Sequence, residues 1–131
     1  MGVKWLTRRW RQELEVILES LEDADPDIKA SALLRTDGLV MAAALPKGAN
    51  ENLIGAMSAA LHNISVKAIA ELECGEIDRV IVTGSKGDIT IKKIAPEIVL
   101  SVITKSGANL GLVLVEIDKA AEKVNQILEQ M

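Results

Sequence analysis

The sequence predicts a single α/β sandwich with the element order αββαβββα and a five-stranded, mainly antiparallel sheet. Three observations predict this fold class. Two pairs of short β-type segments are each joined by a turn that contains glycine. One long helix, with capping residues at both ends, separates the second strand from the third. Apolar residues at helical spacing mark both ends of the chain, so helices are expected to cover most of the sheet.

The first helix is expected over residues 4–23, where one apolar stripe contains Leu6, Trp10, Leu14, Ile17, Leu18 and Leu21. Its basic side chains precede its acidic ones, which is the reverse of what the helix dipole favours. Residues 1–11 are therefore treated as a basic, tryptophan-bearing arm, and residues 12–131 as one domain. The favoured interpretation is a solvated, salt-bridged arm. The functional alternative is weak or indirect attraction to an acidic partner or an anionic membrane surface, through Lys4, Trp5, Arg8 and Arg9.

Two strands are expected before the long helix. Residues 28–35 alternate apolar and other side chains, as a strand with one buried face does. Thr36-Asp37-Gly38 forms a hairpin turn in which Gly38 is free to adopt a positive φ, and residues 39–45 return.

The long helix is expected over residues 50–73, with Asn50 as its N-cap and Gly75 just beyond its end. One broad apolar stripe is assigned to the protein's own core: Leu53, Ile54, Met57, Ala60, Leu61, Ile64, Ala68 and Leu72. A second stripe has the spacing of two helices packed side by side: Gly55, Ala59, His62, Val66, Ile69 and Glu73. Because a helix that is apolar on two sides needs two partner surfaces, we predict that this second stripe packs against its copy in another subunit. The alternative is that it faces solvent or a loop.

Three strands and a helix follow. Residues 77–83 and 88–94 form a second hairpin, and residues 98–104 are apolar on both faces, which predicts a central strand. Residues 112–115 alone are compatible with a strand. The longer helical spacing and the capping residue Asn109 favour a final helix over residues 109–128.

The sequence lacks the usual signs of catalysis. Gly84-Ser85-Lys86-Gly87 joins two strands, whereas a phosphate-binding loop must lead into a helix N-terminus. His62 and Cys74 are the only histidine and cysteine, and twelve residues of helix place them roughly 18 Å apart. We therefore expect no metal, no cofactor and no enzymatic activity.

Composition excludes further classes. A net charge of −4 argues against a nucleic-acid binder. A single cysteine cannot form an intrachain disulfide, so a cytoplasmic setting is expected. No uninterrupted apolar run reaches the roughly 18 residues needed to span a membrane.

These elements together resemble the roadblock/dynein light chain family, and in particular its stand-alone prokaryotic members of MglB type. The resemblance covers about residues 10–128. It is carried by the strand–Asp-Gly–strand segment 31–40, the Ala/Ser/Gly-rich helix, the hairpin that begins with Arg79-Val80-Ile81-Val82, and Asn109-Leu110-Gly111-Leu112 at the start of the last helix.

The resemblance implies a profilin-like fold and a homodimer, in which the middle helices lie side by side and the third strands extend one sheet across both subunits. The implied dimer interface consists of Gly55, Ala59, His62, Val66, Ile69, Arg79 and Ile81. Gly55, Ala59 and His62 are also the implied contacts of a partner.

Members of this family bind small Ras-like GTPases. The resemblance therefore implies an adaptor or regulator that contributes no catalytic residues of its own. An arginine finger is a less favoured variant, with Arg8, Arg9, Arg35 and Arg79 as candidates. The alternative function is a small-molecule sensor or a purely structural scaffold, although the aliphatic core argues against a sensor.

Overall fold

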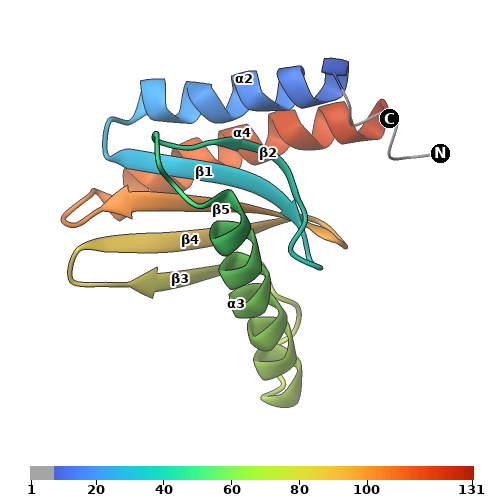
Figure 1. The fold of residues 1–131 in the computed structure, drawn as a ribbon. Coiled ribbons are helices and arrows are strands. Elements are labelled where there is room, and N and C mark those ends of the chain that lie inside the picture. Colours follow the sequence, from blue (N-terminus) through green and yellow to red (C-terminus); the bar gives the residue numbers. More distant parts are fainter. Residues whose placement is uncertain (1–7) are drawn as a thin grey trace.

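The computed structural model describes residues 8–131 and confirms the predicted order of elements (Figure 1). The elements are α2 (Arg8–Ala24), β1 (Ile28–Arg35), β2 (Val40–Ala44), α3 (Glu51–Glu71), β3 (Arg79–Thr83), β4 (Gly87–Ala95), β5 (Ile98–Lys105) and α4 (Leu110–Glu129). Within the described residues each boundary lies within two residues of the predicted one. The predicted first helical turn, with Lys4 and Trp5 of the basic arm, lies outside the described residues.

The five strands form one antiparallel sheet in the order β2-β1-β5-β4-β3. The two-sided apolar strand, β5, is central as predicted. The edges are β2 and β3. The five residues of β3 pair with β4 in unbroken register, whereas the pairing of β2 with β1 shifts register between Leu33 and Leu34. The two edges of the sheet therefore differ in regularity.

Helices α2 and α4 lie side by side and cover one face of the sheet (Figure 1). Alternate residues of β1 and β5 point into this layer, including Leu33, Leu100 and Val102. They meet the apolar stripes of the two helices, of which Leu18 and Ile117 are fully buried. This layer is the main core of the protein, and the stripe predicted for the first helix from Leu14 to Leu21 is confirmed by its burial.

Helix α3 covers part of the opposite face. The buried apolar cluster of this second layer is small, with five members: Ala32, Leu34, Ala59, Ile91 and Val99. Figure 1 shows that α3 crosses the sheet with its first half and that its second half extends beyond the strands. The second layer is therefore thin, and much of α3 has no surface of its own chain to pack on.

Candidate interaction surface

Helix α3 is held at both ends by backbone capping. At its start the Asn50 side chain accepts a hydrogen bond from the Leu53 N–H at 3.0 Å, as predicted. At its end the Cys74 N–H donates to the Ile69 carbonyl at 2.9 Å, and Gly75 takes a φ of +87°. These caps fix where the helix begins and ends.

The face of α3 that lies on the sheet is built from small residues. Gly55, Ser58, Ala59 and His62 are the buried residues of the helix. A Cβ atom on Gly55 would lie 2.5 Å from the Gly38 carbonyl oxygen, so only glycine permits this approach to the β1–β2 turn. One turn further along, the Ser58 hydroxyl donates to the Ser101 hydroxyl of β5 at 2.8 Å.

The assignment of the two stripes from sequence is therefore wrong for the half of the helix that packs on the sheet. Gly55, Ala59 and His62, predicted to face a second subunit or a partner, are buried within the chain, with Ala59 5% and His62 3% exposed. The stripe assigned to the core is instead largely open, with Ile64 69% and Leu72 75% exposed. The physical reason is that small side chains let the helix backbone approach the sheet, which leaves the bulky aliphatic side chains on the outside.

The open stripe borders a cavity. We define the α3 apolar surface as the exposed residues Leu53, Met57, Ala60, Ile64, Ala68 and Leu72. Beside its first half, a recess of about 190 Å³ lies between the helix and strands β4 and β5. Its lining is almost wholly apolar: Leu53, Ile54, Met57, Ser58, Leu61, Ile89, Ser101 and Ile103. Helix and sheet thus present one continuous aliphatic surface. Sequence reasoning missed the contributions of Ile89 and Ile103 because alternation along a strand does not reveal which face stays uncovered.

The remaining residues of the implied dimer interface are accessible to different degrees. Val66 and Ile81 are exposed, whereas Ile69 and Arg79 are partly buried. Arg79 and Ile81 lie on the edge strand β3, and Val66 and Ile69 lie on the projecting half of α3. The structure thus places these four residues on two separate elements.

The arginine-finger candidates that the structure describes are engaged locally. Arg79 pairs with Asp78 at 3.2 Å and with Asp118 of α4 at 3.8 Å. Lys92 completes this cluster, and its hydrogen bond lowers the pKa of Asp78. Arg35 pairs with Asp37 at 2.7 Å.

Arg8 and Arg9 of the basic arm belong to the first turn of α2. The Arg9 guanidinium lies 5.6 Å from the centre of the Trp10 ring, a distance typical of a cation–π contact.

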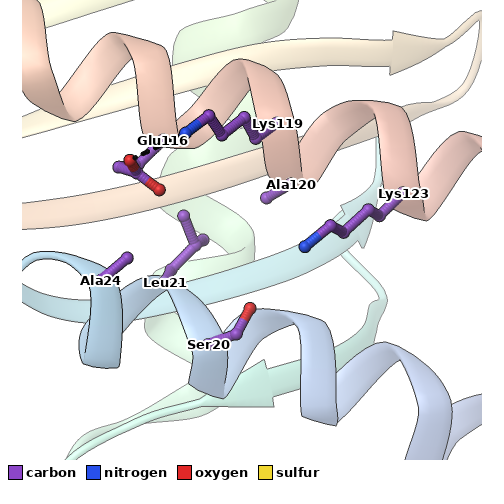
Figure 2. Close-up of a pocket in the computed structure, with 7 residues that line it drawn as sticks. All are labelled: Ser20, Leu21, Ala24, Glu116, Lys119, Ala120 and Lys123. Carbon is purple, nitrogen blue, oxygen red and sulfur yellow. Dashed lines mark ion pairs between the residues drawn. The ribbon is translucent and has the colours of Figure 1, made fainter.

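A smaller hollow lies between α2 and α4 on the other side of the molecule (Figure 2). It has a volume of about 110 Å³ and is lined by Ser20, Leu21, Ala24, Glu116, Lys119, Ala120 and Lys123. Lys119 pairs with Glu116 at 3.5 Å, and Figure 2 shows Lys123 reaching from α4 toward α2. The Ser20 hydroxyl is already used, because it donates to the Ile17 carbonyl. This hollow is a shallow gap between two packed helices.

The described residues also bear on metal sites and on membrane-spanning helices. Among residues 8–131 no group of three or more His, Cys, Asp or Glu side chains is arranged to hold a metal ion. By length and composition alone, α3 is long and apolar enough to cross a membrane. The sequence contains no uninterrupted apolar run of that length, because polar side chains such as Ser58, His62 and Asn63 interrupt this helix.

Residues 14–104 match the family model of the Roadblock/LC7 domain. The chain belongs to the Roadblock/LC7 family. A relative in Methanocaldococcus jannaschii, the protein MJ1340, is 35% identical over 97 residues, which cover 74% of this chain and 84% of the relative. The family match spans both hairpins and all of α3, so the family resemblance inferred from the sequence is confirmed.

Solved structures confirm the roadblock fold. MglB of Myxococcus xanthus superposes with a TM-score of 0.82 at 20% identity, covering 94% of this chain and 92% of that one. A second MglB structure, described as a tetrameric arrangement, gives the same TM-score at 19% identity and covers 94% of this chain and 93% of that one. Profilin IB of Acanthamoeba castellanii gives 0.60 at 14% identity, covering 86% and 97%. The profilin-like character expected of this roadblock protein is therefore present.

Proposed function

We propose that this roadblock protein is a homodimeric, non-enzymatic adaptor or regulator of a small Ras-like GTPase in the cytoplasm, and that the α3 apolar surface joins its two subunits. One observation carries the proposal. An aliphatic stripe runs the length of a helix, and in the first half of the helix the opposite side is already packed on the sheet. Contiguous exposed apolar surface of this kind marks an interaction site in soluble proteins.

A second copy of the chain suits this surface for a geometric reason. In a two-fold symmetric pair the same patch is used by both subunits. Two antiparallel α3 helices could cross near Ala60, a small residue at the middle of the stripe. The projecting half of each helix would then lie over the half-covered sheet of the other subunit, next to the recess lined by Ile89 and Ile103. The aliphatic side chains that have no packing surface within their own chain would then pack against the partner subunit.

The GTPase part of the proposal is supported by membership of the family. Within the described residues this chain brings no phosphate-binding loop, and Arg79 and Arg35 are paired with carboxylates. An effect on a GTPase would therefore come from surface complementarity, which shifts the population of conformations that the GTPase adopts.

The dimer is tested by size-exclusion chromatography coupled to light scattering. Wild-type protein is expected at twice the chain mass. Ala60→Arg, in the centre of the open stripe, is expected to give a folded monomer. Ala70→Arg is the matched control, because Ala70 is also exposed on α3 but lies away from the stripe, and this variant should remain a dimer. Ala59→Arg is unsuitable, since Ala59 is buried in the chain's own core.

A wild-type protein that remains monomeric at high micromolar concentration would contradict the dimer, as would an Ala60→Arg variant that still dimerises.

The partner is tested by biolayer interferometry with purified Ras-like GTPases from the same genome, each loaded with GDP or with a non-hydrolysable GTP analogue. Binding of one GTPase that differs between the two nucleotide states supports a regulator. If none binds, and a metabolite instead raises the melting temperature of the isolated protein, the sensor alternative replaces the proposal.

A further inference from the structure

His62 marks the last point at which α3 is buried against the sheet. It is the fourth and final buried residue of the helix, and the residues from Asn63 to Glu71 are exposed or only partly buried. The neighbouring Asn63 amide donates to the Thr36 carbonyl of the β1–β2 turn at 2.9 Å. The ring of His62 therefore lies where the packed half of the helix gives way to the projecting half.

The surroundings of this ring disfavour a positive charge. Burial lowers the pKa of His62, and the ammonium group of Lys93 on β4 lowers that pKa further. The α3 layer otherwise contributes aliphatic side chains such as Leu34, Val80 and Val99.

Other charged groups occur on the elements nearby. The β1–β2 turn carries Arg35 and Asp37, which pair with each other, and the β4–β5 turn carries Glu97. Lys67 lies one turn further along α3. Among the described residues no carboxylate lies within ion-pair distance of the His62 ring.

We propose that His62 is a pH-sensitive latch, whose protonation in mildly acidic conditions releases α3 from the sheet and with it the apolar surface that the helix presents. Burial favours the neutral form of this imidazole, because a protonated ring would be repelled by Lys93 with no carboxylate of the described residues within ion-pair distance to balance it. Detaching the helix lets water solvate the charged ring.

The direction of the effect follows from proton linkage. The folded state binds the proton less readily than the open state, whose histidine titrates near pH 6.5. Above that value both states are neutral at this residue, and pH has no effect through it. As pH falls from 6.5 toward the lower folded pKa, the open state gains the proton first, so the equilibrium for opening rises about tenfold per pH unit.

The release itself does not depend on the proposed function, and only its consequence for self-association does. It is therefore measured both on wild-type protein and on Ala60→Arg, which tests the latch whether or not the chain dimerises. The untagged chain contains one histidine, so the NMR titration of its ring proton reports His62 alone. Amide hydrogen exchange at pH 7.5 and 5.5, corrected for intrinsic rates, reports the opening of α3.

The expected results are a ring pKa below 6.5 and a loss of protection in α3 of up to about tenfold at pH 5.5, with the amides of β5 unchanged. His62→Gln should abolish this pH dependence. Glu22→Gln should leave it intact and controls for a second titration, since burial and the nearby Asp23 raise the pKa of Glu22 on the opposite layer.

A ring pKa at or above 6.5 would overturn the latch, and so would α3 protection that does not change between the two pH values. If His62→Gln does not fold, the wild-type titration and exchange decide the question by themselves.

Discussion

The two faces of the sheet carry the same kind of apolar side chain, but helices of the chain cover one face far more completely than the other. On the α2–α4 face, fifteen buried apolar residues form one cluster, whereas the buried apolar cluster on the α3 face has only five members. The same strands supply apolar side chains to both faces. In β5, Leu100 and Val102 point toward the α2–α4 layer, whereas Val99 and Ile103 point toward the α3 face. The difference therefore lies in coverage and not in apolarity. A strand pattern that is apolar on both sides shows that both faces need covering, but one chain need not supply both covers.

Truncation of large aliphatic side chains should give the largest difference in unfolding free energy between the two faces. Leu18→Ala removes a fully buried side chain from the α2–α4 layer and is expected to cost about 3 kcal/mol of unfolding free energy. Ile64→Ala, on the exposed stripe of α3, should change the stability of the monomer by less than about 0.5 kcal/mol. Urea denaturation in an Ala60→Arg background gives both values without a contribution from self-association. A loss for Ile64→Ala as large as that for Leu18→Ala would mean that the monomer already buries the α3 stripe.

The next largest difference concerns glycine. Gly55→Ala places a Cβ atom against the backbone oxygen of Gly38, which cannot move aside cheaply, and is expected to cost about 2 kcal/mol. Gly111→Ala is the control in α4, where the new Cβ atom would lie 3.4 Å from its nearest neighbour, Asn109 Oδ1, at the edge of ordinary contact. This variant should gain up to about 1 kcal/mol from helix propensity. A lower melting temperature for Gly55→Ala and a higher one for Gly111→Ala would support the role of small residues in setting the distance of α3 from the sheet. A higher melting temperature for both variants would contradict that role.

The smallest expected difference in stability is between serine hydroxyl groups on the two faces. Ser58→Ala and Ser101→Ala each break a buried hydrogen bond of 2.8 Å and should cost about 1 kcal/mol, with a double variant that costs less than the sum. Ser31→Ala on the α2–α4 face loses only a 3.5 Å contact to the Leu18 carbonyl and should cost less. Strict additivity of the Ser58 and Ser101 variants in a thermodynamic cycle would show that the two hydroxyl groups do not interact.

The fold was predictable because local signals and overall pattern agree. The Asp37-Gly38 turn, the caps at Asn50 and Asn109, and the two-sided apolar strand 98–104 each indicate one element, and their order allows few topologies. Gly38 does adopt a positive φ, and β5 does lie at the centre of the sheet. These signals act over a few residues, which is the range that a sequence displays directly.

The orientation of α3 was not predictable in the same way. Helical spacing shows that Leu53, Met57 and Ile64 share one face, but it does not show which face the chain covers itself. Bulky side chains were assigned to the core by default, whereas the structure uses Gly55 and Ala59 there so that the backbones approach closely. A glycine inside a helix, together with a hairpin turn that also contains glycine, is the signal in the sequence that indicates this contact within one chain.

The unequal edges of the sheet bear on how large an assembly can become. Strand β3 keeps an unbroken register with its neighbour, whereas β2 at the other edge has the same length but shifts register against β1, an irregularity that disfavours further strand pairing. A chain with two regular edges could add copies at both ends without limit and grow into a fibre. A chain with one regular edge differs, because pairing of its β3 with the β3 of a second chain would leave no regular edge exposed. If the chain assembles by this route, growth would stop at two chains, and the irregularity of β2 would be what limits it.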